Sequence, residues 1–238
     1  MSADKESCPF WEIQNGRFLR PQSLDAIRSE KGRILADVVA QIDNGLKVFL
    51  RGSLLECPNP FTDADADLFI IFKDFGQLEA LRGILPHNYN YDIKQIREGD
   101  EGSDFVYHAL LHCRSLQLCG EPLFDAPVYA DKEFAWRHWV KYCPALIPSV
   151  IDSSNSWSLI HFKLLVRCFG VLSFLRDRRF TREIGPCITF AEMENPQMGQ
   201  KLKKMRVSIE NHSADTFALG EIKAHLANRF DELFPTWD

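Results

Sequence analysis

The sequence has no Cys-x-x-Cys pair, no excess of basic residues, no Walker-type phosphate loop and no internal repeat. Its 28 Lys and Arg stand against 33 Asp and Glu, a formal net charge of −5. This balance disfavours a general nucleic-acid-binding protein, because such proteins usually carry a basic surface. The seven cysteines are odd in number and unpaired in spacing, which favours a reducing compartment. We therefore expect a cytoplasmic protein.

Long apolar segments are also missing. The first 20 residues mix both charges and have no apolar centre, so we expect no membrane-targeting segment there. The most apolar helical stretch, residues 158–175, contains His161, Lys163 and Arg167. It is therefore expected to be a core helix and not a membrane span. With 238 residues, 45% of them apolar and 26% charged, the chain has the composition of a globular protein with one large or two small domains.

The most informative pattern lies in residues 50–72. Gly52-Ser53 follows a short apolar strand, and Asp65 and Asp67 precede the apolar run Leu68 to Phe72. Side chains in an extended segment alternate faces, so two acids that are two residues apart point the same way. Paired carboxylates suit hard divalent cations, and a glycine turn lets backbone N–H groups approach a phosphate. The pattern indicates metal-assisted chemistry on a nucleoside triphosphate.

This pattern resembles the nucleotidyltransferase fold of the polymerase-beta type, in which Gly-Gly or Gly-Ser is followed about a dozen residues later by acid-x-acid entering a strand. Gly52-Ser53 and Asp65-x-Asp67 match in order and spacing, and Asp92 supplies the third acid that the family has on a later strand. The resemblance implies that Asp65 and Asp67 hold two magnesium ions and that Asp92 completes the metal site or acts as the base. It also implies that Gly52 and Ser53 bind the triphosphate.

Three alternatives remain for the acidic segment. Asp63 and Asp65 have the same spacing; we favour Asp65 and Asp67 because Leu68 begins the apolar strand at once, although Ala64 stands where the family more often has serine. A calcium loop starting at Asp63 is disfavoured because position 6 of that template needs glycine and is occupied by Leu68. The third alternative is a solvated acidic loop before a core strand.

The C-terminal half carries a second resemblance. Leu164-Leu-Val-Arg167-Cys-Phe-Gly and Phe180-Thr-Arg182-Glu-Ile are similar to segments of aminoglycoside adenylyltransferases of the streptomycin/spectinomycin type. The resemblance makes Arg167 and Arg182 candidate phosphate or substrate contacts. Lys94 shares a strand face with Asp92 and is a further candidate for the triphosphate.

We expect an α+β protein. Residues 1–122 are predicted to form a nucleotidyltransferase α/β domain with a mixed sheet, and residues 131–238 a helical, substrate-binding bundle. In the first domain, strands are expected at about 48–50, 67–72 and 88–96. Helices are expected there at 24–42, capped by Ser23, and at 75–85 and 104–118. Helices in the second domain are expected at 132–142, 156–176, 181–193, 199–212 and 214–233.

The resemblance implies a Mg²⁺-dependent enzyme that moves AMP from ATP, or the equivalent group from another nucleoside triphosphate, to a hydroxyl of a small acceptor such as an aminoglycoside. Transfer to tRNA or to a protein is the first alternative. A non-catalytic nucleotide-binding protein of the same fold is the second. The sequence suggests no membrane partner and leaves the oligomeric state open.

Overall fold

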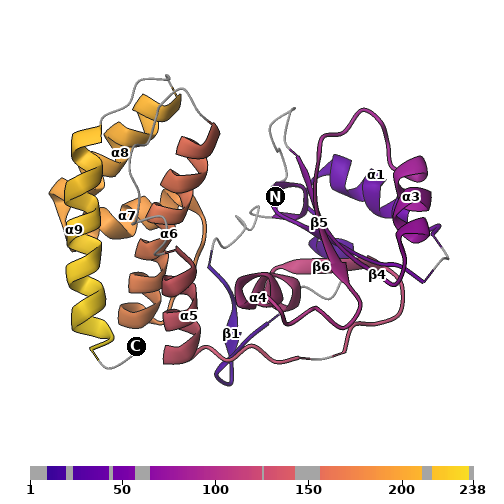
Figure 1. Cartoon of the computed structure of the whole chain (residues 1–238), viewed down its shortest axis with the longest axis horizontal. Coiled ribbons are helices and arrows are strands. Elements are labelled where there is room, and N and C mark those ends of the chain that lie inside the picture. The colour runs from indigo at the N-terminus through magenta and orange to yellow at the C-terminus, as the bar shows by residue number, and fades with distance from the viewer. Residues whose placement is uncertain are drawn as a thin grey trace, which may run out of the picture. The chain divides into compact units, whose positions relative to one another are not determined.

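The computed structural model describes residues 10–19, 24–42, 45–56, 65–124, 126–142, 156–210 and 216–235. They form helices together with a mixed β-sheet, which confirms the expected α+β class (Figure 1). The chain divides into two compact units. The first contains Glu12–Tyr129 and the second contains Ala130–Asp238 together with Trp11.

Four strands form the main sheet of the first unit. In the order β5-β4-β3-β6, they are β5 (Tyr91–Arg97), β4 (Ala66–Phe72), β3 (Lys47–Arg51) and β6 (Ser115–Cys119). β4 and β5 are parallel, whereas β3 is antiparallel to both of its neighbours. Nearly every residue of β4 is buried, which explains its unbroken apolar sequence, since both faces of the strand are covered.

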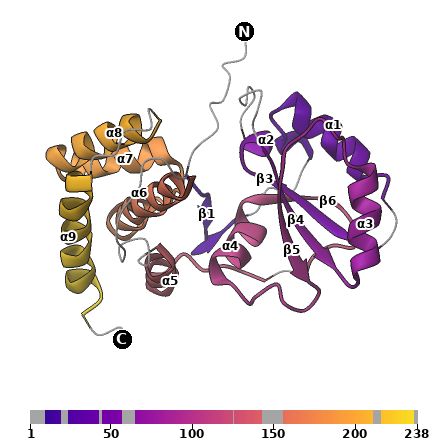
Figure 2. The ribbon, with the colours of Figure 1, turned by 45° about the horizontal axis from the view of Figure 1, so that its top comes forward.

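Helices cover both faces of this sheet. Figure 2 shows α1 (Glu30–Val39) and α3 (Phe75–Ile84) on one side and α4 (Phe105–Cys113) on the other. Ala66, Leu68, Ile70 and Phe72 belong to the same buried cluster as apolar residues of α1 and α3. Because side chains alternate along a strand, Asp67 and Phe69 lie on the opposite face, and Phe69 contacts Tyr107 of α4.

Two expectations for this unit were wrong. Residues 104–118 do not form one helix: α4 ends at Cys113 and residues 115–119 form β6, which pairs with β3. The apolar spacing of α4 runs on through Leu116 and Leu118, and this continuity hid the break. Helix α1 begins only at Glu30, after the N-cap Ser29, and Leu24–Ala26 forms a separate 3₁₀ turn. Ser23, the expected cap, lies outside the described residues.

A small hairpin that the sequence analysis did not predict precedes these elements. Strands β1 (Ile13–Gln14) and β2 (Arg17–Phe18) pair antiparallel. Asn15 and Gly16 between them have φ values of 50° and 74°. An Asn-Gly pair with positive φ is the favoured two-residue hairpin turn, and this dipeptide was the available signal.

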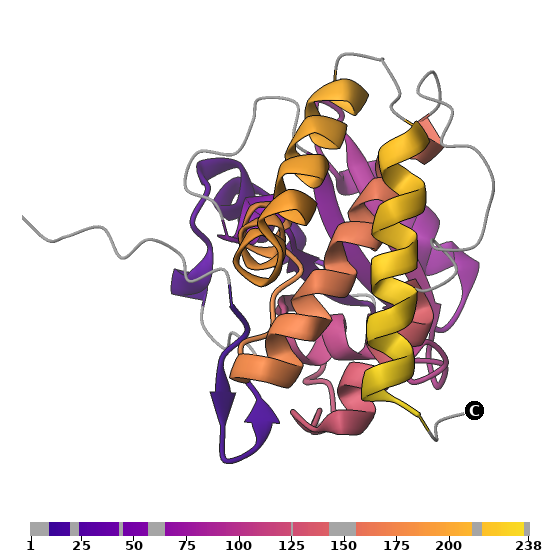
Figure 3. The same cartoon turned by 90° about the vertical axis from the view of Figure 1, so that its left-hand side faces the viewer.

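The second unit is helical in its described part. Its helices are α5 (Lys132–Tyr142), α6 (Ser156–Asp177), α7 (Ile184–Glu194), α8 (Pro196–Glu210) and α9 (Thr216–Leu233). Figure 3 looks onto α8 and α9. An aromatic cluster fills part of the interior, where Phe134, Phe174 and Phe180 meet edge to face and Trp11 packs on Phe180. No helix in the described ranges combines the length and the apolar character that a bilayer crossing requires.

Candidate functional site

Three charged side chains meet where β3, β4 and β5 lie side by side. Arg51 is the register partner of Asp67 across β3 and β4, and Asp67 is the partner of Asp92 across β4 and β5. The Nη2 atom of Arg51 lies 3.0 Å from Asp67 Oδ1 and 3.0 Å from Asp92 Oδ2. The two carboxylates therefore converge on a single cationic nitrogen.

The environment of Asp67 makes its negative charge costly. Its side chain is 24% exposed, whereas that of Asp92 is 60% exposed. Burial raises the pKa of Asp67 from 3.8 to about 6. Arg51 opposes this shift, while the charge of Asp92, a hydrogen bond with Asp92 and the charge of Asp65 add to it. Burial is thus the main reason for the raised pKa, and the neighbouring acids add a smaller repulsion that an added cation would relieve.

Gly52 is required for this arrangement. Its φ is 72°, in the left-handed region that glycine adopts without strain. A Cβ atom at this position would lie far inside van der Waals contact with Asp67 Oδ2. The turn after β3 and the carboxylate of Asp67 are therefore packed against each other, and Ser53 follows directly as the first residue of α2 (Ser53–Glu56).

Hydrogen bonds hold the Gly-Ser turn and the short helix α2 in place. Leu55 N–H and Glu56 N–H both donate to Gly52 O at 3.1 Å. Ser29 Oγ donates to Leu54 O at 2.6 Å while it accepts from the N–H of Gly32, so the cap of α1 also anchors α2.

A side-chain ion pair fastens the far end of α2. Arg114, directly after α4, pairs with Glu56 at 2.7 Å. Both side chains are mostly shielded from solvent, with exposed fractions of 18% and 24%. The Gly-Ser turn is therefore attached to elements on both faces of the sheet, which limits its freedom to move away from Asp67.

Asp65, the first acid of the predicted metal pair, does not complete a three-ligand group. Its side chain is exposed, and its negative charge helps to raise the pKa of Asp67. Within the described residues, no set of three or more His, Cys, Asp or Glu side chains is gathered closely enough to hold a metal ion. Asp63 and Ala64, on which the choice of register depends, lie outside those residues.

The residues present nevertheless fit a magnesium ion. Mg²⁺ is usually bound through one or two carboxylates together with water and substrate phosphates. Asp67 and Asp92 supply two such carboxylates, and the guanidinium between them shows that their oxygens can share one cation. A calcium loop that starts at Asp63 would have Asp74 as its twelfth residue, but Asp74 caps α3, where its side chain accepts from Gln77 N–H.

Lys94, the further candidate for the triphosphate, contacts an aromatic ring. Its ammonium lies over the ring of Tyr107, 4.2 Å from the centroid. Tyr107 belongs to α4, which covers the Asp67 face of the sheet. The structure thus places Lys94 on the expected face, held against an aromatic ring.

Arg167 and Arg182 are brought together within the helical unit. Arg167 Nε donates to the carbonyl oxygen of Arg182 at 3.3 Å. Burial, and then the like charge of Arg182, lower the pKa of Arg167 to about 10. The Nε of Arg182 and the hydroxyl of Tyr142 are buried without a hydrogen-bond partner. Two neighbouring guanidiniums of this kind favour an anionic ligand.

Arg51 belongs to the candidate site, and the sequence patterns did not indicate it. It stands immediately before Gly52-Ser53, and the available signal was its position at the end of the strand that leads into the turn. Recognising its role required knowing that β3 and β4 pair with Arg51 opposite Asp67. No spacing rule in the sequence gives this register.

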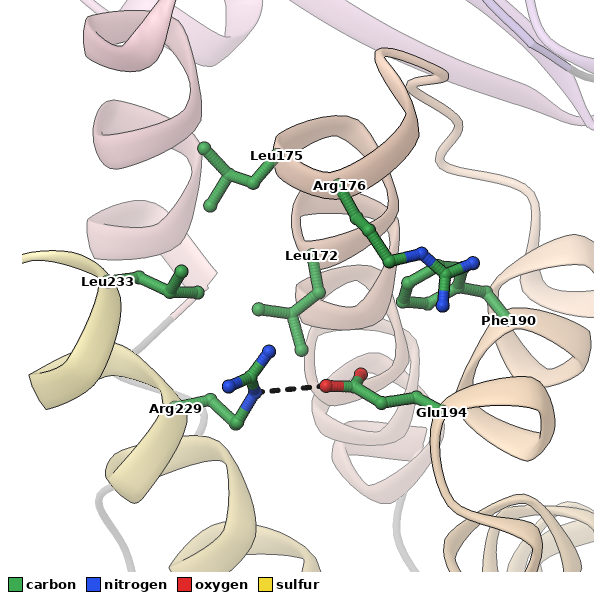
Figure 4. A pocket seen from close by; sticks show the side chains of 7 residues that line it. All are labelled: Leu172, Leu175, Arg176, Phe190, Glu194, Arg229 and Leu233. Atoms are coloured by element: carbon green, nitrogen blue, oxygen red, sulfur yellow. Dashed lines mark hydrogen bonds and ion pairs between the residues drawn. The ribbon is translucent and has the colours of Figure 1, made fainter.

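The helical unit also contains a pocket of about 170 Å³ (Figure 4). Each of its charged groups already has a partner: Arg229 Nε lies 2.9 Å from Glu194 Oε1, and the guanidinium of Arg176 lies over the ring of Phe190. The remaining lining side chains are Leu172, Leu175 and Leu233. The pocket holds none of the predicted site residues, and we assign it no part in the chemistry.

Comparison with known proteins adds no assignment. No protein-family model matches the sequence, and no curated protein matches it. The case for a function therefore depends on the residues and their geometry.

Proposed function

We propose that this chain is a Mg²⁺-dependent nucleotidyltransferase that transfers AMP from ATP to a hydroxyl group of a small molecule such as an aminoglycoside. One observation carries the proposal. The carboxylates of Asp67 and Asp92 converge on a single cation. They do so directly beside a glycine turn that has no room for a side chain.

In the proposed reaction, the Gly52-Ser53 turn binds the β- and γ-phosphates through backbone N–H groups and the Ser53 hydroxyl. Asp67 and Asp92 hold the metal, with Asp65 as the further acid that the resemblance implies. The bound metal would supply charge neutralisation at the attacking and leaving oxygens. Asp92, the more exposed of the two converging acids, is also the proposed base that takes the proton of the acceptor hydroxyl.

In the proposed transfer, one bond to phosphorus forms and one breaks. The acceptor oxygen forms a bond to the α-phosphorus, the bond from that phosphorus to the bridging oxygen of the β-phosphate breaks, and pyrophosphate leaves. Arg167 and Arg182 add an anion-binding pair, which the resemblance assigns to phosphate or substrate. Lys94 is the weaker candidate for this role, because its ammonium already lies over Tyr107.

The cellular setting belongs to the same proposal. The described cysteines Cys113, Cys119, Cys168 and Cys187 are free thiols. Free, mostly buried thiols accord with a reducing cytosol, where ATP and magnesium are abundant.

The test is a transfer assay with α-³²P-labelled ATP and magnesium. Purified protein is offered an aminoglycoside panel, bulk tRNA and lysate proteins in separate reactions. We expect label on an aminoglycoside. In Asp67→Asn, whose fold is verified by circular dichroism, we expect a loss of roughly 10²–10³-fold, the size typical when an electrostatic group of a reaction centre is removed. Asp37→Asn, at an exposed position on α1, is the matched control and should retain activity.

The other outcomes are decisive as well. Label on tRNA or on protein, with none on small molecules, would replace the proposed acceptor. An absence of transfer to every acceptor, combined with nucleotide binding, would favour the non-catalytic alternative. One observation supports that alternative: Arg51 already bridges both carboxylates, as expected of a site that has exchanged its metal for a fixed charge.

A further inference from the structure

We infer that Arg51 is a resident counter-cation that competes with divalent metal for Asp67 and Asp92, so that metal binds only when the guanidinium leaves. This inference rests on the proposed function, since it concerns the same site. It assigns Arg51 an electrostatic role that no sequence motif indicated.

The first step in the argument is geometric. One nitrogen, Arg51 Nη2, sits 3.0 Å from an oxygen of each carboxylate. A magnesium ion would need oxygens from the same pair at about 2.0–2.1 Å. The guanidinium nitrogen and the ion therefore cannot both occupy the space between the two carboxylates.

The second step concerns how Arg51 is held. Its guanidinium carbon lies 4.9 Å from the centroid of the Phe69 ring. Phe69 is two residues along β4 from Asp67, on the same face. The Arg51 side chain is only 17% exposed, and its Nε is buried without a hydrogen-bond partner. Arg51 is therefore held by its ion pairs with the two carboxylates and by its contact with the Phe69 ring.

The third step is electrostatic. Two carboxylates in contact repel each other when both are ionised, and one nearby cation relieves that repulsion. Arg51 supplies this cation from within the chain. An incoming divalent ion gains the attraction of the carboxylates but must also displace a partly buried guanidinium, which lowers its net affinity.

The experiment measures metal binding directly, apart from any transfer activity. Free Mn²⁺ is titrated against the full-length protein and followed by electron paramagnetic resonance, with no nucleotide present. Arg51→Gln should bind Mn²⁺ about tenfold more tightly than the wild type, within the usual range of coupling between two competing ligands. Without metal it should also melt at a lower temperature, and Mn²⁺ should raise its melting temperature more than that of the wild type.

Lys47→Gln is the matched control. The Lys47 side chain is 17% exposed, as that of Arg51 is, and Lys47 lies at the other end of β3, where it pairs with Glu98 at 3.2 Å. Its loss therefore removes a comparable ion pair away from the acids. The Mn²⁺ affinity of Lys47→Gln should equal that of the wild type. Equal affinity in Arg51→Gln would overturn the inference and leave the proposed function standing. Absence of Mn²⁺ binding in both the wild type and Arg51→Gln would instead remove the metal site on which the proposed function depends.

A second measurement covers the case in which Arg51→Gln does not fold. In the unmodified protein, nitrogen NMR of the arginine side chains reports whether each guanidinium rotates freely. Added Mg²⁺ should release the Arg51 guanidinium from restricted rotation while that of Arg114 stays unchanged. A guanidinium of Arg51 that stays restricted at saturating Mg²⁺ would also overturn the inference.

Discussion

The raised pKa of Asp67 predicts that its ionisation destabilises the fold. Its native pKa is about 6, against an ordinary value of 3.8. Between these two pH values the native protein still holds the proton that the unfolded chain has released. The contribution of Asp67 to the free energy of unfolding is therefore fully present below pH 3.8, and it is lost as the pH rises through about 6.

The magnitude follows from the same two numbers. A difference of about two pKa units corresponds to about 3 kcal/mol at 1.36 kcal/mol per unit. The side chain is less than one quarter exposed, so solvent screening reduces this value only modestly. Asparagine has the shape of the protonated acid and cannot ionise. The free energy of unfolding of Asp67→Asn, minus that of the wild type, should therefore rise by up to about 3 kcal/mol between pH 4 and pH 7.5.

The assay is urea denaturation at several pH values, followed by far-UV circular dichroism. Groups far from position 67 titrate alike in both proteins, so their contributions to the free energy of unfolding cancel in the difference. All five tryptophans, at positions 11, 136, 139, 157 and 237, lie in the sequence outside residues 12–129, the range of the first unit. Their fluorescence should report a transition that the substitution leaves unchanged. A difference that stays flat with pH, or that falls, would show that the Arg51 ion pair outweighs burial and would refute the argument.

Three further predictions concern packing and reactivity. Gly52→Ala should destabilise the first unit by at least about 1–2 kcal/mol in urea denaturation, because it combines a left-handed backbone with a collision at Asp67. Gly170→Ala should cost about 1–3 kcal/mol, seen as an earlier tryptophan fluorescence transition, because its new methyl group would strike Thr181 O. Burial raises the pKa of the Cys187 thiol to about 12. At pH 8, mass spectrometry should therefore find this thiol unmodified by iodoacetamide until urea unfolds the helices; rapid labelling of the folded protein would contradict this.

Much of the first unit follows from local patterns. The apolar run of β4 and the helical spacing of α3 are strong signals, and the structure places both elements close to their expected bounds. Strand β6 was not predicted, because Leu116 and Leu118 fit the helical spacing of the preceding residues as well as the alternation of a strand. Its pairing with β3 is a long-range contact, and such contacts override local preference.

The candidate site likewise combines residues that local patterns indicate with residues that only long-range pairing brings in. The sequence indicated Asp67, Asp92 and Gly52, since each stands at a strand end or a turn with a recognisable motif. It did not indicate that Arg51 lies between the acids, because that depends on strand register. Nor did it show that Asp65 would remain exposed, since residues just outside a strand are not bound by its alternation. The joining of Arg167 to the carbonyl of Arg182 likewise depends on how two segments of the helical unit pack.

The position of Asp92 in the sheet also affects how the chain can associate with itself. It lies on β5, which is an edge strand of the four-stranded sheet. Charged side chains on such a strand discourage another copy of the chain from adding to the open edge. Asp92 and Arg97 are both exposed there. Replacing Asp92 to probe the chemistry would therefore also weaken a barrier to self-association, and the size of that variant in solution has to be checked before its loss of activity is interpreted.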